Sequence, residues 1–262
     1  PGNTLVLTAR SALPEAEAAD TAALESAEAL RQHFIAQVRA GASKLKPGEI
    51  QRQVQQLLAL REMRANIADF RAAGAAVEYH AIDVTDEAAM QGLLEGLYAR
   101  HGRIDGVLHG AGVIEDKRLA DKASDSWSRV VDTKVIGLLL LHKHLRPACG
   151  LKFVSLFSSV AGRYGNSGQS DYATANELMN RIAEHLRGRW PAVNVHALCW
   201  GPWGATKFGA GMVTAETEAK FRDKGVTLVD AATGRRLFSD EIARAAGPVE
   251  VVCGAGPWEA HE

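Results

Sequence analysis

The pattern of apolar and polar positions divides the chain into short apolar runs and longer segments with helical spacing. The first run, Thr4 to Arg10, has adjacent apolar residues without clean alternation, which is typical of a strand buried on both faces of a parallel sheet. This alternation of runs and segments predicts an α/β fold, with a parallel sheet covered by helices on both faces. Further strands are predicted at 77–82, 104–109, 153–159, 193–200 and 249–253, and helices between them at about 86–100, 126–145 and 172–187.

A long helical segment interrupts the alternation after the first strand. Apolar residues recur at helical spacing over 21–40 and 49–73, with Pro47 at a helix start and Gly74 after the last helical residue. The outer faces are rich in Arg and Gln, which is typical of a solvated insertion rather than of a basic binding patch. We therefore expect one domain over residues 1–262 with a helical insertion at about 21–73.

Composition narrows the class of protein. The 262 residues are 47% hydrophobic and 23% charged, and 30 Lys and Arg against 31 Asp and Glu leave a formal net charge of −1. This balance gives no reason to expect nucleic acid or an anionic membrane as a partner, and no apolar run is long enough to span a bilayer. Cys149, Cys199 and Cys253 lack metal-ligand spacing, so we expect buried thiols in a reduced, cytoplasmic compartment and no metal site.

Small and polar residues follow five of the predicted strands. In a parallel α/β sheet the carboxyl ends of the strands share one edge, and ligands bind beyond that edge. The sequence therefore predicts a ligand site built from Arg10 and Ser11, Asp83 and Val84, Gly110 to Gly112, Ser158 and Ser159, and Gly201 to Trp203.

Four residues near this edge suit proton transfer to a carbonyl oxygen. Tyr172 lies 13 residues after Ser159 at the start of a predicted helix, and Asn176 follows one turn later on the same face. A phenol with a pKa of ~10 exchanges protons slowly at neutral pH unless a cation favours the phenolate, and Lys134 on the preceding helix would supply that cation. A serine at the strand end would polarise the carbonyl of a substrate to be reduced. Ser158 is the nearest competitor of Ser159 for this role.

The motifs Ser-Ser-Val-Ala-Gly at 158–162 and Tyr-Ala-Thr-Ala-Asn at 172–176 resemble the short-chain dehydrogenase/reductase superfamily, whose fold is a Rossmann-like doubly wound sheet. Most members have lysine at the position of Asn176. Ketoreductase domains of polyketide synthases instead have asparagine there and lysine on the preceding helix, and Lys134 matches that exchange. The segments 109–113, 199–203 and 235–238 agree further. The helical insertion and the segment 211–214 are similar to ketoreductases of polyunsaturated fatty acid synthases.

The resemblance implies an NADPH-dependent β-ketoacyl reductase that acts on a chain carried by acyl carrier protein, with neighbouring synthase domains as further partners. It implies that Tyr172 donates a proton, Ser159 holds the carbonyl, Lys134 tunes the phenol and Asn176 organises a proton relay. Arg10 is implied as the ligand of the 2′-phosphate of NADPH, because a guanidinium matches phosphate oxygens; its alternative is an ordinary surface arginine. The other cofactor contacts implied are Ser11, Asp83, Val84, Gly110, Ala111, Gly112, Tyr172, Gly201, Pro202 and Trp203.

Stereochemistry is indicated by two further positions of the same family. Ile114-Glu115-Asp116 stands where the family has Leu-Asp-Asp for one product hand, and Tyr164 stands where a tryptophan marks the other hand. This combination favours the D-3-hydroxy product. The resemblance assigns Asp116 and Gln169 to substrate positioning, and the alternative for Asp116 is an ordinary loop residue.

The family's first strand and its glycine-rich loop have no counterpart ahead of Leu5. The missing strand would be central, between the strands at Leu5 and Val107, and its absence would leave backbone groups unpaired. We therefore expect a fragment of a larger multidomain synthase that binds NADPH poorly alone. Two other functions stay open, namely a catalytically silent ketoreductase-like structural module and a free-standing short-chain alcohol dehydrogenase.

Overall fold

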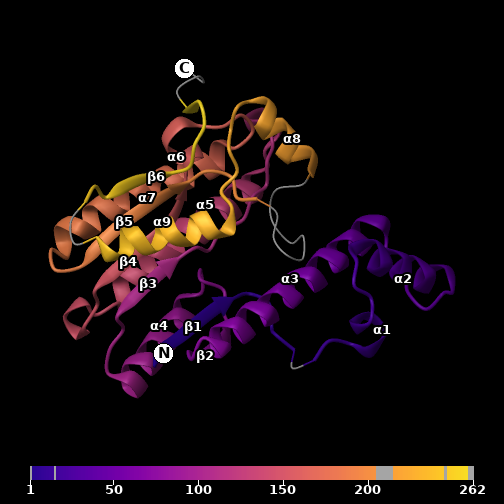
Figure 1. Cartoon of the computed structure of the whole chain (residues 1–262), viewed down its shortest axis with the longest axis horizontal. Helices are drawn as coiled ribbons and strands as arrows, with labels where there is room; N and C mark the ends of the chain where they lie inside the picture. The colour runs from indigo at the N-terminus through magenta and orange to yellow at the C-terminus, as the bar shows by residue number, and fades with distance from the viewer. Residues whose placement is uncertain (1, 15, 205–214, 245–246, 259–262) are drawn as a thin grey trace. The chain divides into compact units, whose positions relative to one another are not determined.

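The computed structural model describes residues 2–14, 16–204, 215–244 and 247–258 (Figure 1). The chain divides into two compact units. Unit 1 comprises residues 1–81 with 205–214, and unit 2 comprises residues 82–204 with 215–262. The segment 211–214, which contributed to the resemblance, lies outside the described residues.

Unit 1 contains a two-stranded parallel sheet and a set of helices. Strand β1 (Thr4–Ala9) pairs along its whole length with β2 (Ala76–Ala81). The apolar residues at 5–7 are half-buried, so the expected burial of this strand on both faces is not found within the unit. A two-stranded sheet offers few neighbours that can cover its faces. The helices of unit 1 are α1 (Ala19–Ala22), α2 (Ala27–Arg39) and α3 (Pro47–Ala72).

The predicted helical insertion forms a hairpin of α2 and α3 with its own apolar core. The side chains that meet between the two helices are at most 8% exposed, and they are Leu30, Phe34, Ile50, Val54 and Leu58. The single helix predicted over 21–40 is divided into α1 and α2. Ser26 begins α2 because its side chain accepts a hydrogen bond from the Ala29 N–H at 3.1 Å, which is a strong start signal for a helix.

Arg61 of α3 ties down the segment that leads into the hairpin. Its guanidinium donates to both carboxylate oxygens of Glu17, at 2.9 and 2.7 Å. It also donates to the backbone carbonyls of Thr21 and Leu24. This bidentate pair is largely buried and belongs wholly to unit 1.

Unit 2 is built on a parallel sheet of four strands in the order β3-β4-β5-β6. Their bounds are β3 (Gly106–His109), β4 (Phe153–Ser159), β5 (Asn194–Trp200) and β6 (Glu250–Cys253). The helices are α4 (Glu87–His101), α5 (Ser124–His144), α6 (Val160–Tyr164), α7 (Ser170–Arg189), α8 (Ala215–Asp223) and α9 (Ala231–Ala243), with short 3-10 turns at Leu119–Asp121 and Pro147–Cys149.

Helices cover both faces of this four-stranded sheet. Successive residues of a strand point to opposite faces, so β5 shows which helix covers which side. Cys199 contacts Asn180 of α7, whereas its neighbours Leu198 and Trp200 pack in a cluster with Phe238 of α9. In Figure 1, α9 crosses in front of the strands. The parallel strands and helices on both faces confirm the predicted Rossmann-like α/β arrangement.

The strands of the chain belong to two separate sheets. Strand β1 pairs with β2 in unit 1, and β3 pairs with β4 in unit 2. In the family's fold a central strand lies between the strands at Leu5 and Val107, and the described residues contain no such strand. Within those residues β1 pairs with β2 alone, and β3 pairs with β4 alone.

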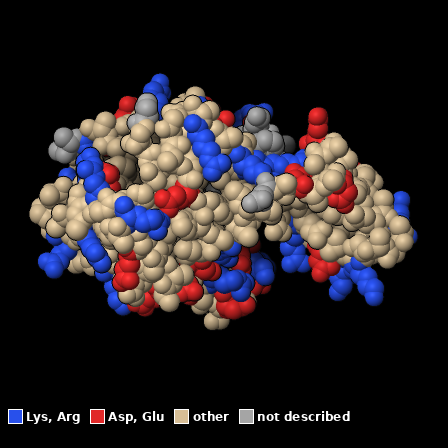
Figure 2. Space-filling model, turned by 90° about the horizontal axis from the view of Figure 1, so that it is seen from below, with Lys and Arg blue, Asp and Glu red and all other residues tan. Residues whose placement is uncertain are grey.

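Charged side chains of both signs are intermixed on the face shown in Figure 2. Within the described ranges, no helix is both long and apolar enough to cross a bilayer. The same residues contain no group of three His, Cys, Asp or Glu side chains arranged to hold a metal ion. Cys149, Cys199 and Cys253 are free thiols, and two of them, Cys199 and Cys253, are buried.

Candidate active site

Lys134 and Tyr172 come together beside the carboxyl end of β4 in unit 2. Lys134 belongs to α5 and Tyr172 to the first turn of α7. The ammonium Nζ lies 5.6 Å from the centroid of the phenol ring. A cation within about 6 Å of an aromatic ring is attracted by the negative face of the ring. Two of the four expected catalytic side chains therefore interact directly, although they are 38 positions apart in the sequence (172 − 134 = 38).

The Lys134 side chain is almost completely enclosed. It is 3% exposed, and Nζ donates to the backbone carbonyl of Phe157 at 3.0 Å. Gly112 lies against it, because a Cβ atom at that position would be 3.1 Å from Cε and 3.3 Å from Nζ of Lys134. Burial lowers the pKa of Lys134 to about 8, since the ammonium loses hydration. This amine can therefore lose and regain a proton close to neutral pH.

His109, the last residue of β3, supports the backbone of α5 beside this lysine. Its Nε2 donates to the Lys134 carbonyl at 2.8 Å, and the side chain is 3% exposed. Burial lowers the pKa of His109 to about 4. The imidazole is therefore neutral at physiological pH and serves as a fixed hydrogen-bond donor.

Ser159 ends β4 and begins α6. Its Oγ accepts a hydrogen bond from the Ala161 N–H at 3.1 Å, and a hydroxyl that accepts one bond can still donate another. Burial raises the pKa of Tyr172, and polar contact with the side chains of Ser159 and Asn176 opposes that rise. Ser159 thus lies beside the phenol. Ser158 points elsewhere, because its buried hydroxyl donates to the Asn176 carbonyl at 3.3 Å.

Asn176 is fully buried one turn after Tyr172. Its Nδ2 donates to the Tyr172 carbonyl at 2.7 Å, whereas its Oδ1 has no hydrogen-bond partner among the described residues. Gly162 of α6 packs closely here, since a Cβ atom there would be 2.8 Å from the Asn176 Cβ. A buried amide oxygen without a donor is uncommon and marks a place where water or a ligand can supply one.

Asp116 and Gln169 bind each other across two loops. The Gln169 Nε2 donates to both Asp116 carboxylate oxygens, at 3.1 and 3.0 Å. The backbone adds a second tie, because the Lys117 N–H donates to the Gly168 carbonyl at 3.0 Å. The negative charge of Asp116 also contributes, as a minor cause after burial, to the raised pKa of Tyr172.

Glu115 takes no part in that contact, although it is the middle residue of the segment compared with Leu-Asp-Asp. Its carboxylate accepts hydrogen bonds from Arg129 at 2.9 and 3.0 Å and from the Ser126 hydroxyl. Pairing with Arg129 and the bond from Ser126 lower the pKa of Glu115 to about 2. Glu115 anchors the loop to α5, which leaves Asp116 as the carboxylate that faces Gln169.

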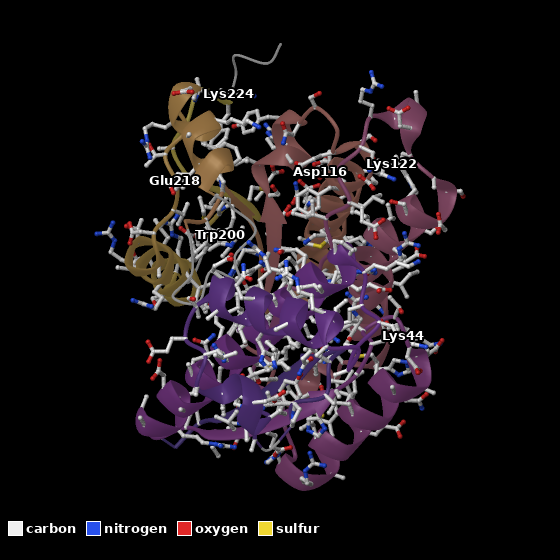
Figure 3. The ribbon with its side chains drawn as sticks, turned by 90° about the vertical axis from the view of Figure 1, so that its right-hand side faces the viewer. Lys44, Asp116, Lys122, Trp200, Glu218 and Lys224 are labelled. Atoms are coloured by element: carbon white, nitrogen blue, oxygen red, sulfur yellow. The ribbon has the colours of Figure 1, made fainter. Side chains whose placement is uncertain are left out.

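A buried ion pair between Lys122 and Asp171 also borders the site, and sequence reasoning missed it. Lys122 Nζ lies 2.7 Å from Asp171 Oδ2, and both side chains are 1% exposed. The two residues are 49 positions apart, so no local pattern links them. The available signal in the sequence is Asp171, a charged residue directly before Tyr172 at the start of a helix. Lys122 is labelled in Figure 3 beside Asp116.

The expected adenine contacts have local structural roles. The Asp83 side chain accepts from the Thr85 N–H at 3.0 Å and from its hydroxyl at 2.8 Å, which forms an Asx turn ahead of α4. Val84 packs against Gly137 of α5, where an added Cβ would be 3.1 Å from the valine Cγ2. Both residues belong to unit 2 and are therefore held by its helices.

The glycines after β3 leave backbone uncovered at the sheet edge. A Cβ atom at Gly110 would touch the Phe157 ring only at an ordinary distance of 3.7 Å, so steric crowding does not require glycine there. Gly112 is different, because Lys134 occupies the space a side chain would take. Ala111, between them, is half-buried.

The residues after β5 are held by backbone hydrogen bonds to β6 and to Val229. The Gly201 N–H donates to the Cys253 carbonyl at 2.9 Å, and the Pro202 carbonyl accepts from the Val229 N–H at 2.8 Å. The Trp203 ring contacts the Trp200 ring at a tilted angle, with ring centroids 4.9 Å apart (Trp200 is labelled in Figure 3). This segment follows β5 beside the end of β4, because Ser159 and Trp200 are register partners.

Arg10 and Ser11 belong to unit 1 and follow β1 directly. Both side chains are exposed. The Ser11 carbonyl accepts a hydrogen bond from the Tyr79 hydroxyl of β2 at 2.5 Å, which fixes the backbone at the strand end. The structure thus brings together Lys134, Ser159, Tyr172 and Asn176 in unit 2, whereas Arg10 and Ser11 lie at a strand end of unit 1.

Known proteins match this chain in sequence and in structure. The KR domain family matches residues 55–205. One component of the polyunsaturated fatty acid synthase of Thraustochytrium sp. is 35% identical over 217 residues, which cover 82% of this chain and 7% of that protein. The ketoreductase from the first module of phoslactomycin biosynthesis in Streptomyces sp. HK803 has a TM-score of 0.66 and 32% identity, covering 74% of this chain and 44% of that one. A ketoreductase domain from the bacillaene assembly line has a TM-score of 0.66 and 27% identity, covering 98% and 51%.

The chain therefore belongs to the KR domain family, the ketoreductase domains of polyketide and polyunsaturated fatty acid synthases. This is an oxidoreductase family, and the expected resemblance is confirmed. The chain spans less than a tenth of the length of the curated synthases that it matches.

Proposed function

We propose that this chain reduces a β-ketoacyl thioester, carried on acyl carrier protein, to the 3-hydroxyacyl product with NADPH as the hydride source. The observation that carries the proposal is the convergence of Lys134, Ser159, Tyr172 and Asn176 at one strand end. The Lys134 ammonium lies 5.6 Å from the centroid of the half-buried Tyr172 ring. In carbonyl reduction it stabilises the phenolate that forms when Tyr172 gives up its proton.

The residues present fit a nicotinamide cofactor. The Asn176 Oδ1 is buried without a donor in the described part of the chain, and Gly110 adds no side chain at the exposed end of β3. Gly201, Pro202 and Trp203 follow β5, on the other side of β4 from β3, and backbone hydrogen bonds hold Gly201 and Pro202. We propose that these residues, with Asp83, Val84 and Ala111, hold the cofactor, which when bound supplies a hydride to the carbonyl carbon. Arg10 and Ser11 would hold its 2′-phosphate.

The side chains of unit 2 then complete the reduction. Hydride addition to the β-carbon moves the carbonyl π electrons onto oxygen, and the Ser159 hydroxyl stabilises the developing charge by donating to it. The Tyr172 O–H bond breaks as its proton moves to that oxygen, which completes the alcohol. The Lys134 ammonium stabilises the phenolate, and a proton from solvent restores the phenol.

Steady-state reduction of a β-ketoacyl thioester by the complete natural polypeptide tests the proposal, with loss of NADPH absorbance as the signal. Tyr172→Phe should reduce kcat by at least about a hundredfold, because it keeps the ring and removes the proton donor. Tyr98→Phe in α4, outside the proposed site, is the matched control and should keep wild-type kcat. A Tyr172→Phe variant with undiminished activity would refute the mechanism.

The same experiment separates the other two functions. A silent structural module would show no turnover in the wild type, although Lys134, Ser159, Tyr172 and Asn176 are all present. A free-standing alcohol dehydrogenase would prefer simple ketones to the carrier-bound thioester. The relatives are named as synthases, which favours the acyl carrier protein and neighbouring synthase domains as partners. A cytoplasmic location is part of the proposal and agrees with three free cysteines.

We propose that Asp116 and Gln169 determine the configuration of the hydroxyl-bearing carbon in the product. Their bidentate contact places a loop with exposed Ile114 and Leu119 beside the start of α7. We propose the D-3-hydroxy product. Asp116→Ala should erode the ratio of product enantiomers, which chiral chromatography of the released product measures, and an unchanged ratio would rule out this role.

A further inference from the structure

The ion pair between Lys122 and Asp171 closes the loop that carries Asp116. Lys122 stands at the end of this loop, directly after the 3-10 turn Leu119–Asp121. Its Nζ donates to the Asp171 carboxylate at 2.7 Å and also to the Glu115 carbonyl at 2.8 Å. One ammonium therefore holds the beginning and the end of the segment 115–122 together and attaches both to α7.

The other oxygen of Asp171 is directed at the catalytic residue itself. Asp171 Oδ1 accepts a hydrogen bond from the Tyr172 N–H at 2.8 Å. The first N–H groups of a helix have no partner within the helix, so this bond fixes the backbone from which the phenol projects. A carboxylate in the first turn is also favoured by the helix dipole.

Complete burial of both charges argues that the pair has a positional role. Each side chain is 1% exposed, and removal of two ions from water opposes folding unless their geometry is well satisfied. Apolar side chains would fill the same space at a smaller desolvation cost, but they would not hold hydrogen-bonding groups in a defined orientation. The ion pair orients two backbone groups by hydrogen bonds, namely the Glu115 carbonyl and the Tyr172 N–H.

We propose that Lys122 and Asp171 are positioning residues that set the Tyr172 phenol and the Asp116 loop in one geometry. This inference rests on the proposed function. Tyr172 is oriented because its backbone N–H donates to the Asp171 carboxylate, and Asp116 is oriented because both ends of its loop are bound by Lys122. The pair thereby couples the proton donor to the loop that is proposed to select the product hand.

Lys122→Met and Asp171→Asn in the complete natural polypeptide test the inference. Lys122→Met keeps the length of the side chain and removes the charge, whereas Asp171→Asn keeps an oxygen for the Tyr172 amide. We expect Lys122→Met to lower kcat at least tenfold and to erode the ratio of product enantiomers. Lys122→Arg, which keeps the charge, should restore part of both losses.

Arg61→Met is the matched control. It breaks a largely buried ion pair with Glu17 in unit 1, so it reports the general effect of losing such a pair. It should leave kcat and the enantiomer ratio within twofold of the wild type. If Lys122→Met does not fold, the neutral double variant Lys122→Met with Asp171→Asn, which leaves no unpaired buried charge, takes its place with the same expected losses.

Hydrogen exchange of the segment 170–176 separates this inference from the proposed function. We expect at least tenfold faster exchange at the start of α7 in Lys122→Met and wild-type exchange in Arg61→Met. An inactive wild type would refute the proposed reaction, whereas faster exchange in Lys122→Met alone would still support the positioning role. Folded Lys122 variants with wild-type kcat, enantiomer ratio and exchange would overturn the inference.

Discussion

The Lys134 ammonium lies 5.6 Å from the centroid of the Tyr172 ring and donates to the Phe157 carbonyl at 3.0 Å. A lysine on α5 is thereby fixed between the end of β4 and a tyrosine on α7. Burial acts on the two groups in opposite directions, since it lowers the pKa of Lys134 to about 8 and raises the pKa of Tyr172. The neutral forms of both are favoured, so the ammonium is the group that titrates first as pH rises.

The pH dependence of reduction follows from this order. As pH rises through about 8, Lys134 loses its charge and the phenolate loses its stabilising cation, while Tyr172 still keeps its proton. We expect kcat to fall with an apparent pKa near 8. Lys134→Arg, which stays charged, should move this fall to higher pH, and steady-state rates across a pH series would show it. An unchanged alkaline limb in Lys134→Arg would contradict the assignment.

Gly112 should be intolerant of a side chain. Gly112→Ala places a Cβ atom 3.1 Å from the Lys134 Cε, so the lysine must move. Small displacements of catalytic groups can cost about a hundredfold in rate, and we expect kcat to fall at least tenfold. Gly92→Ala in α4 is the control, because nothing lies within 4 Å of the added atom. It should keep kcat and stabilise the helix by roughly 0.5–1 kcal/mol in thermal or denaturant unfolding. Equal kcat in both variants would argue against the crowding at Lys134.

Arg10 should decide the choice between NADPH and NADH. A hydrogen bond to a charged group contributes about 1.5–3 kcal/mol, so Arg10→Ala should raise the Kd for NADPH roughly 10- to 100-fold and leave the Kd for NADH unchanged. Fluorescence titration of the complete natural polypeptide with each cofactor measures both values. Arg39→Ala, another exposed arginine of unit 1, should change neither. Equal weakening of both cofactors would reject a phosphate contact.

His109 should make unit 2 less stable in mild acid. Its pKa is about 4 in the folded protein and near 6.5 when exposed, so the unfolded chain binds more protons between these values. Stability therefore falls as pH drops from about 6.5 to 4, by at most about 3 kcal/mol from this group. His109→Gln retains a donor for the Lys134 carbonyl and does not titrate. Urea unfolding at several pH values should therefore show that the free energy of unfolding of His109→Gln falls less steeply toward acid pH than that of the wild type. A slope as steep as that of the wild type would contradict the assignment to His109.

The sequence predicted the regular elements best where one pattern was unambiguous. The strand predicted at 153–159 is β4 with the same bounds, and Pro47 begins α3 as its position predicts. Short elements were missed. Helix α6 lies in a segment interpreted as a loop, and it forms because Ser159 caps it and Gly162 lets it pack against Asn176. Helix α9 was also missed, although Asp230 caps it by accepting from two N–H groups.

The sequence by itself determined which chemical groups this protein has and which strand ends carry them, because residue type and strand periodicity are local properties. It placed Ser159, Tyr172 and Asn176 on neighbouring elements by spacing alone. Only the tertiary structure decided the surroundings of these groups. The contact of Lys134 with the Tyr172 ring, the contact of Asp116 with Gln169 and the ion pair of Lys122 with Asp171 join residues that are 38, 53 and 49 positions apart. Such contacts depend on how helices pack on the sheet, and no local pattern encodes that packing.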